Sequence, residues 1–316
     1  KACFNRHIGL CPGVCSGEIS KTEYRKIVKR ISLLFQGKKV QLLRSLERDM
    51  KKLAKEERFE EAALLRRQVF ALTHIQDISL IKDESELRFI PELEKYCKTV
   101  KVFNRPKSPW TFRNIFLACF SFYPLLVVRN FSPKLRSAIR DELANEKYDL
   151  IHAETFYVMP HVPKSTIPSI LVEQTIEYQV YKHFVDTKVP FFLRPIFMVD
   201  IIKLRFWELY FWKKTDKLVA VSDDDKKVMQ QLIPNIPVDA IPNGVDAKHF
   251  SSKKVEKKSP PRVMYGVTNF EWLQNVEAVD TLIDEVWPHI HKFVPEAKLW
   301  IVGRKFPERL LELSKV

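Results

Sequence analysis

The sequence predicts an α/β protein in which an N-terminal helical hairpin arm precedes a body of doubly wound parallel sheet. Apolar residues recur at helical spacing from residue 20 to about residue 80. Short apolar runs of strand length then alternate with helical patterns, which is typical of parallel sheets. Polar turns follow several of these runs, and such sheets bind ligands at the carboxyl ends of their strands.

The composition is that of a folded, basic protein. Of its 316 residues, 46% are hydrophobic and 12% aromatic, which allows a sizeable core and argues against disorder. The net charge of +14 suits an acidic partner such as nucleic acid, an anionic membrane surface or a nucleotide diphosphate. It could equally serve only to keep the protein in solution. The five cysteines do not form a secreted disulfide framework, so a reducing compartment is expected.

Three of the cysteines lie in the first 19 residues, which we interpret as a loop: Cys3, Cys11 and Cys15. Their close spacing beside glycine and proline fits a soft-metal or iron–sulfur site. Three ligands are one fewer than the usual four, and unliganded thiols explain the spacing equally well.

Residues 20–82 are predicted to be a helical region, which begins with the capping-box pattern of Ser20–Glu23. Apolar spacing predicts helices near residues 24–35, 40–53 and 59–70. The second and third helices form a hairpin with a narrow, alanine-rich seam and little core. We therefore expect a matching hairpin from a partner to pack against it.

The first 82 residues resemble the middle of the bacterial excinuclease protein UvrC, a DNA-repair protein, through CFNRHIGLCPGVCSGEIS and FQGKKVQLLRSLERDMKKLAKEERFEEAALLRRQV. The resemblance implies an iron–sulfur cluster whose fourth ligand is missing from this sequence. It also implies a UVR motif at about residues 46–80 that binds its counterpart in the excinuclease protein UvrB, so that DNA is a partner only indirectly. Nothing here resembles the nuclease domains of that family. The expected partner-binding residues are Phe59, Ala62, Ala63 and Arg66.

From Leu87 onward, apolar runs and polar turns predict an α/β body. Ser132 and Pro133 begin a helix. In the segment from Lys217 to Phe250, an apolar strand, a helix capped by Ser222 and a second strand lead to a turn at Asn243-Gly244, where we expect positive φ. The predicted strands of the body are 98–103, 148–152, 169–172, 218–221, 238–241, 262–267 and 298–303.

The body resembles the GT-B fold of sugar-nucleotide glycosyltransferases of the family 4 type, through KLVAVSDDD and IPNGVDAKHF. Residues 87–242 correspond to its N-terminal Rossmann-like domain without the first strand, and residues 243–316 to the start of its C-terminal one. The resemblance implies a nucleotide-diphosphate sugar as donor, and His152 and Glu177 as contacts to the acceptor. Gln174 stands where the family often has histidine. The expected donor-binding residues are Asn243, Gly244, Thr268, Asn269, Gly303 and Arg304.

Several departures from that family lead us to expect weak donor binding and no turnover. Glu271 and Gln274 stand where many members have an arginine and a lysine for the donor diphosphate. The glycine-rich turn of the first domain and the acidic Glu-x7-Glu element of the second are also missing from this sequence. The chain is therefore interpreted as a fragment.

Two stretches are unusually aromatic, at residues 110–128 and 190–212. The stretch at 190–212 mixes bulky apolar residues with arginine and lysine, which suits a helix on a membrane surface near a lipid-linked acceptor. A helix buried on one face, bridging two domains, explains the composition as well. The expected location is the cytoplasm, with peripheral attachment at the inner membrane face as an alternative.

Three functional interpretations follow: a glycosyltransferase fragment with a foreign N-terminus, a DNA-repair interaction module, or a genuine fusion of both. Nothing chemical connects a UVR hairpin with glycosyl transfer. We therefore expect the first for most of the chain, joined to the second by sequence assembly or rearrangement.

Overall fold

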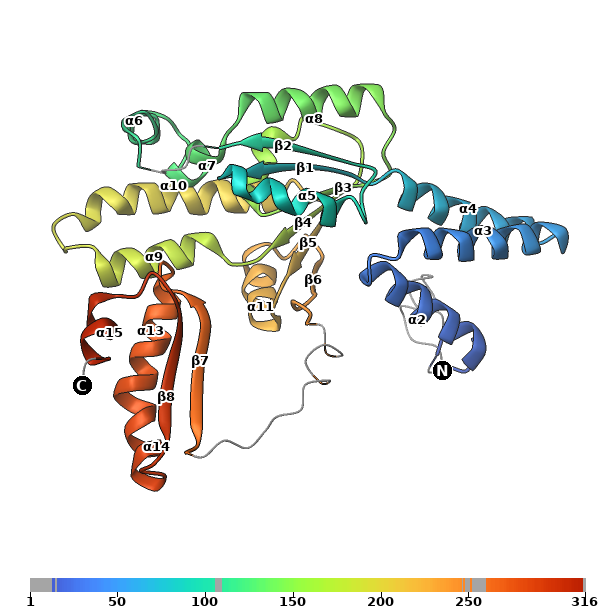
Figure 1. Cartoon of the computed structure of the whole chain (residues 1–316). Helices are drawn as coiled ribbons and strands as arrows, with labels where there is room; N and C mark the ends of the chain where they lie inside the picture. Colours follow the sequence, from blue (N-terminus) through green and yellow to red (C-terminus); the bar gives the residue numbers. More distant parts are fainter. Residues whose placement is uncertain are drawn as a thin grey trace. The chain divides into compact units, whose positions relative to one another are not determined.

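The computed structural model describes residues 13–14, 16–105, 110–245, 247, 251 and 260–314. Figure 1 shows its helices and strands, whose expected α/β class is confirmed. The chain divides into two compact units. The first comprises Lys1–Tyr178 with Ile196–Ile241, and the second comprises Gln179–Pro195 with Pro242–Val316.

The first unit begins with three helices, α2 (Lys21–Phe35), α3 (Lys39–Lys55) and α4 (Phe59–Thr73). The predicted capping box is present at the start of α2. The Glu23 amide donates to Ser20 Oγ at 3.1 Å, and the Ser20 amide donates to Glu23 Oε2 at 3.2 Å. These two bonds satisfy amides that the first turn of a helix leaves without partners.

Helices α3 and α4 form the expected hairpin, and its interior is small. The buried side chains of the two helices are Leu42, Leu46 and Ala62. Helix α2 is tied to α3 by an ion pair between Arg30 and Asp49, with a nitrogen–oxygen distance of 2.5 Å. The hairpin thus gains its stability mainly from local contacts.

A strand follows the hairpin directly, at a place where the apolar spacing predicts a continued helical region. Strand β1 (Gln76–Ile81) pairs in parallel with β2 (Thr99–Asn104). The strands expected for the body begin with residues 98–103, which form β2. The structure places one more strand before it, β1, as its parallel neighbour. Polar and apolar residues alternate along Asp77-Ile78-Ser79-Leu80, a period of two that indicates a strand. Between β1 and β2 lie a 3₁₀ helix (Glu84–Phe89) and α5 (Ile90–Leu93).

A second, four-stranded sheet has the order β3-β4-β5-β6, and all its pairings are parallel. Its centre is deeply buried, since Leu171 and Leu218 on the two middle strands have no exposed surface. Continuous apolar character along such strands is typical of parallel sheets covered on both faces. The strands are β3 (Ile151–Glu154), β4 (Ser169–Glu173), β5 (Lys217–Ala220) and β6 (Val238–Ala240).

Helices connect the strands as in doubly wound folds (Figure 1). Ser132 Oγ accepts from the Leu135 amide at the start of α8, and Ser222 Oγ accepts from the Asp225 amide at the start of α11. Among the described helices, none is both long and apolar enough to cross a membrane. The remaining elements of this region are α6 (Phe112–Phe120), α7 (Leu125–Asn130), α8 (Pro133–Asn145), a 3₁₀ helix (Phe156–His161), α9 (Glu177–Lys188), α10 (Arg194–Trp212) and α11 (Asp223–Leu232).

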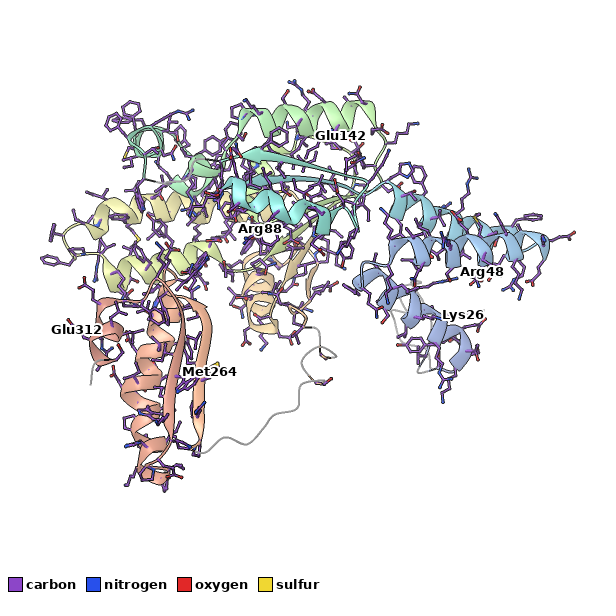
Figure 2. All side chains as sticks on the ribbon, in the orientation of Figure 1. Lys26, Arg48, Arg88, Glu142, Met264 and Glu312 are labelled. Carbon is purple, nitrogen blue, oxygen red and sulfur yellow. The ribbon has the colours of Figure 1, made fainter. Side chains whose placement is uncertain are left out.

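The second unit contains the parallel pair β7 (Arg262–Asn269) and β8 (Lys298–Arg304). Its core is formed by Phe270, Val279 and Leu310. Between the strands run α13 (Leu273–Thr281), a π-helical turn (Leu282–Val286) and α14 (Trp287–Phe293), and α15 (Glu308–Leu313) follows β8. Figure 2 shows the side chains of both units.

Candidate functional site

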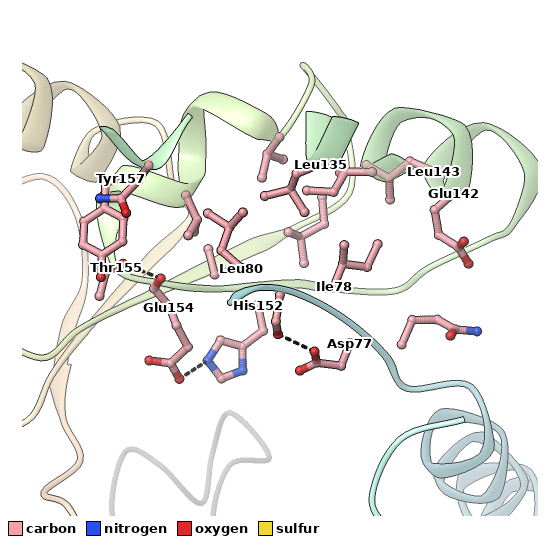
Figure 3. A pocket seen from close by; sticks show the side chains of 18 of the residues that line it. Asp77, Ile78, Leu80, Leu135, Glu142, Leu143, His152, Glu154, Thr155 and Tyr157 are labelled. Atoms are coloured by element: carbon pink, nitrogen blue, oxygen red, sulfur yellow. Dashed lines mark hydrogen bonds and ion pairs between the residues drawn. The ribbon is translucent and has the colours of Figure 1, made fainter. Parts of the chain in front are cut away.

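A cavity of about 490 Å³ lies between β1 and β3, the neighbouring edges of the two sheets in the first unit. Its walls have two chemical characters (Figure 3). Ile78, Leu80 and Leu135 line the side covered by α8. Asp77, His152 and Glu154 point to the opposite side of the strands. The cavity therefore combines an apolar wall with a polar edge.

His152 and Glu154 form the centre of the polar edge. They are two residues apart on β3, so strand geometry places both on one face. His152 Nε2 lies 3.2 Å from Glu154 Oε1, and Gln174 Nε2 donates to Glu154 Oε2 at 3.4 Å. The hydrogen bond to Glu154 raises the pKa of His152, and its partner His152 lowers the pKa of Glu154. The edge thus offers an imidazole, a carboxylate and an amide to a hydroxyl-rich ligand.

Arg105 and Asn130 close the cavity at the end of β2. Arg105 Nη1 donates to Asn130 Oδ1 at 2.7 Å, and Asn130 Nδ2 donates to the Leu126 carbonyl at 2.8 Å. Because Asn130 is buried and doubly bonded, the guanidinium is held in one position. A fixed cation is suited to bind an anionic group of a ligand.

The structure does not bring together the two residues expected to contact the acceptor. His152 lines the cavity, whereas Glu177 is not among its lining residues. The amides of Glu177 and Tyr178 donate to the two carboxylate oxygens of Glu208, at 2.8 and 3.0 Å. Burial raises the pKa of Glu177. Glu177 therefore belongs to the start of α9 rather than to the polar edge.

Two buried carboxyl groups near this helix were not predicted from the sequence. Trp212 Nε1 donates to Glu173 Oε1 at 2.9 Å, and Glu208 caps α9 as described. Burial raises the pKa of Glu173 well above its usual range and that of Glu208 to about 8. The sequence contained a signal for one of them, because Glu208 lies within the aromatic run Trp207–Trp212. A carboxyl group buried among aromatic side chains needs a hydrogen-bond partner, which here is the start of α9.

Four of the six expected donor-binding residues lie side by side in the second unit. Thr268 and Asn269 end β7, Gly303 and Arg304 end β8, and the strand register pairs them. A Cβ on Gly303 would lie 2.5 Å from the Thr268 carbonyl oxygen, so this close approach requires glycine. The carboxyl ends of parallel strands are where such sheets bind ligands.

A carboxylate lies beside this strand end. Asn269 Nδ2 donates to Glu271 Oε2 at 3.1 Å, and the Glu271 amide donates to Asn269 Oδ1 at 3.3 Å. The Asn269 side chain is thereby occupied, and its neighbour carries a negative charge. Both features oppose the binding of a diphosphate.

The other two expected donor residues, Asn243 and Gly244, follow β6. The predicted positive φ at Gly244 is wrong, because the glycines with positive φ in the described chain are Gly13, Gly17, Gly37 and Gly266. A Cβ at Gly244 would also meet open space. The Asn-Gly pair predicted a turn with a residue in the left-handed region, but neither Asn243 nor Gly244 adopts a positive φ after β6.

In the arm, Phe59, Ala63 and Arg66 are exposed as a docking face requires, whereas Ala62 is buried. Ala62 faces the interior of the hairpin and cannot itself contact a partner there. Cys3, Cys11 and Cys15 lie outside the described residues. Within the part of the chain that is described, no cluster of three or more His, Cys, Asp or Glu side chains could hold a metal ion.

Two family models match separate parts of this chain. Residues 100–249 match Glycosyltransferase Family 4, and residues 41–73 match the UvrB/UvrC motif. The first match contains the four-stranded sheet and His152, and the second coincides closely with the α3–α4 hairpin.

Curated proteins similar to the N-terminal part carry the name UvrABC system protein C. That of Caldanaerobacter subterraneus is 42% identical over 91 residues, which are 28% of this chain and 15% of that protein. That of Methanosarcina acetivorans is 42% identical over 77 residues, 24% of this chain and 15% of the relative. That of Clostridium kluyveri is 44% identical over 75 residues, 24% of this chain and 12% of the relative.

This chain therefore spans 15% or less of the length of these relatives. Two different family models match separate segments of one sequence, and their residue ranges do not overlap. The chain joins a UvrC-like N-terminal segment to a segment similar to glycosyltransferase family 4.

Proposed function

We propose that the α/β part of the chain serves glycosyl transfer from a nucleotide-diphosphate sugar. The observation that carries this proposal is the polar edge of the cavity, which lies on the sheet matched by Glycosyltransferase Family 4. Transfer requires an acceptor hydroxyl held in place while the donor diphosphate is neutralised. In this proposal, one set of residues holds the acceptor hydroxyl and a different set neutralises the donor diphosphate.

The acceptor is proposed to bind at His152, Glu154 and Gln174. The imidazole and the carboxylate hold one another in place at 3.2 Å. A sugar hydroxyl of the acceptor substrate would therefore meet two ordered side chains with which it can form hydrogen bonds. The apolar wall of Ile78 and Leu80 excludes water on the other side. We also propose a lipid-linked acceptor and a cytoplasmic location at the inner membrane face, because exposed aromatic helices belong to the same unit.

The donor is proposed to bind weakly at the ends of β7 and β8. Arg304 is the cation of this strand end, and Glu271 faces the same place with the opposite charge. An anion near a diphosphate raises the free energy of binding through repulsion and leaves Arg304 as the main attraction. We therefore expect weak donor binding and little or no turnover from this chain.

Calorimetry with uridine and guanosine diphosphate sugars tests the donor site. The unchanged chain should bind weakly, Arg304→Ala should abolish the remaining heat, and Glu271→Arg should tighten binding by about tenfold. Lys298→Ala, at the opposite end of β8, is the control and should leave the affinity unchanged. Tight binding that neither Arg304→Ala nor Glu271→Arg alters would place the donor elsewhere.

A second function is supported by the arm. We propose that the α3–α4 hairpin binds the UVR hairpin of the excinuclease protein UvrB, with DNA contacted only through that partner. Phe59, Ala63, Arg66 and Phe70 are spaced for one face of α4, and all four are exposed. A helix face of this kind is suited to helix-in-groove or hairpin-to-hairpin packing.

A pull-down with UvrB tests this second function. Phe59→Ala and Ala63→Glu should each abolish capture, because Phe59 is an exposed aromatic anchor and Ala63 permits close approach. Phe35→Ala, an equally exposed phenylalanine on α2, is the matched control. Capture that survives both substitutions would remove this function.

A further inference from the structure

Helix α6 and the turn after it present phenylalanine side chains to solvent. Phe112 is 85% exposed, Phe120 is 79% exposed and Phe122 is 87% exposed, and Phe116 on the same helix is also exposed. A single exposed apolar side chain needs no explanation, but a cluster of this size marks an interaction site. The cluster lies in the first unit, on the same chain segment that matches the glycosyltransferase model.

Helix α10 is fastened to this segment by specific bonds. Lys203 Nζ donates to the carbonyl oxygens of Ala118 and Ser121, at 2.8 Å each. Trp207 Nε1 donates to the Phe122 carbonyl at 2.7 Å, and the Trp207 ring stacks on Tyr123. These contacts hold α6, its C-terminal turn and α10 together as one element of the surface.

The outer side of α10 continues the apolar character. Its inner side buries Ile201 and Leu204, whereas a stripe of apolar residues at helical spacing is exposed. The exposed stripe consists of Ile196, Val199, Ile202 and Phe206. We call the exposed residues Phe112, Phe116, Phe120, Phe122, Ile196, Val199, Ile202 and Phe206 together the aromatic face.

The exposed charged residues of α6 and α10 are of one sign. Both acidic residues of α10 are used internally, since Asp200 Oδ1 accepts from the Leu125 amide at 2.9 Å and Glu208 caps α9. Helix α6 contains no acidic residue. Arg113 on α6 and Arg205 on α10 are exposed. The two helices therefore offer apolar and positively charged groups to solvent, and their carboxylates face inward.

We propose that the aromatic face docks on an anionic lipid bilayer, with α6 and α10 lying on the surface and their phenyl rings entering the headgroup region. Bulky apolar residues combined with arginine are the composition of helices that lie in the membrane interface. The described helices cannot span the bilayer, so the contact is peripheral. A protein partner is less suited, because the charge is single-signed and complements a uniformly negative surface. The inference rests on the proposed location at a membrane face and goes beyond it by naming the residues and the lipid charge that make the contact. Vesicle binding does not require glycosyl transfer, so the two proposals can fail separately.

Vesicle flotation with the full chain tests the proposal. The protein should float with vesicles of equal parts phosphatidylcholine and phosphatidylglycerol at low salt, and much less with phosphatidylcholine alone. The double variant Phe122→Ser/Phe206→Ser should bind these vesicles at least about tenfold more weakly, since two apolar side chains are lost from the contact. Phe293→Ser changes an equally exposed phenylalanine in the second unit and should bind like the unchanged protein.

The arginines supply a second test with its own signature. Arg113→Gln and Arg205→Gln should each weaken binding to the anionic vesicles by about fivefold. Raising the salt concentration should reduce the difference between these variants and the unchanged protein. Binding to phosphatidylcholine alone should be the same for all three.

Two results would overturn the proposal. One is that the chain stays unbound with anionic vesicles at low salt, or that the double phenylalanine variant floats as the unchanged protein does. The other is a dimer by size-exclusion chromatography that the double variant converts to a monomer while neither binds vesicles. In that case the aromatic face is an interface between two copies of this chain.

Discussion

The α3–α4 hairpin and the four-stranded sheet bury their apolar side chains to very different extents. The hairpin encloses Leu42, Leu46 and Ala62 and leaves larger side chains such as Phe59 and Phe70 exposed. The sheet region buries Leu171, Leu218, Phe156 and Trp212 completely or almost so. The two regions are separated in the sequence by the pair β1–β2 and the helices that follow it, since α4 ends at Thr73 and β3 begins at Ile151.

The difference in burial indicates which kind of contact stabilises each region. The hairpin relies on ion pairs such as those of Arg58 with Glu56 and Glu61 and on a few neighbouring contacts, and its exposed apolar residues remain available for a partner. The sheet relies on burial between segments that are distant in the sequence. A substitution in one region should therefore have little effect on the other, which can be tested because all six tryptophans lie after residue 109.

The largest expected effect is that of Trp212→Ala. The side chain is completely buried, and its removal leaves a large cavity and takes the donor from Glu173 Oε1. We expect a loss of about 3–5 kcal/mol in the free energy of unfolding of the sheet region. Urea unfolding followed by tryptophan fluorescence measures this, while hydrogen exchange of α3 and α4 amides should not change. Trp272→Ala, which removes an exposed tryptophan, is the control.

A smaller effect is expected for Leu46→Ala in the hairpin. Leu46 is 2% exposed and lies in a core of only a few side chains, so we expect a loss near the lower end of the range for buried leucine, about 2 kcal/mol. The amides of α3 and α4 should exchange faster, and the tryptophan-detected transition should stay in place. Leu64→Ala, on the exposed side of α4, should have no effect on either. A shift of the tryptophan transition would show that hairpin and sheet unfold together.

Local sequence signals predicted much of both regions. The capping pattern at Ser20 and Glu23, and the serine caps at Ser132 and Ser222, depend only on neighbouring residues and are present as expected. The hairpin and the sheet strands also follow from apolar spacing. These features could be found because their determinants lie within a few residues of one another.

The features that were missed depend on context. Strand β1 follows the hairpin so directly that its alternation was assigned to the helical region. The pairing of Trp212 with Glu173 and the cap from Glu208 join residues that are distant in the sequence, which no local pattern shows. The polar edge was found only in part, since His152 was predicted and Glu154, two residues later on the same face, was not.

Changing the pH should affect the two regions in opposite directions. Burial raises the pKa of Glu208 to about 8, above its value in the unfolded chain, so folding binds a proton. The contribution of Glu208 to stability should then be complete at low pH and be lost as pH rises toward 8, by about 1 kcal/mol between pH 6 and pH 7. The Ser20 hydroxyl lowers the pKa of Glu23 in the arm, so stability there should be lost as pH falls through that carboxyl's titration.

Urea unfolding at several pH values, followed by tryptophan fluorescence, measures the pH slope of the sheet region. Glu208→Gln cannot titrate and should reduce that slope, whereas Glu285→Gln, in the second unit, should leave it unchanged. Burial also raises the pKa of Glu173, so part of the slope should remain in Glu208→Gln. The interpretation fails if stability rises between pH 6 and pH 7, or if Glu208→Gln leaves the slope as steep as in the unchanged protein.

The smallest expected effect is the loss of the α2 cap by Ser20→Ala. The Ser20 hydroxyl accepts from the Glu23 amide and donates to Glu23 Oε2, and the Ser20 amide donates to the same carboxylate. The substitution therefore removes two of the three hydrogen bonds and loosens the third. Amides in the first turns of α2 should exchange about fivefold faster, with no change in the tryptophan-detected transition. Ser32→Ala, at an exposed position inside the helix, should leave exchange equal or slower, because alanine is the better helix former. Equal acceleration by both substitutions would contradict this prediction, because it would mean that α2 opens as a whole rather than from its capped end. The cap at Ser20 would then not be what stabilises the first turns of α2.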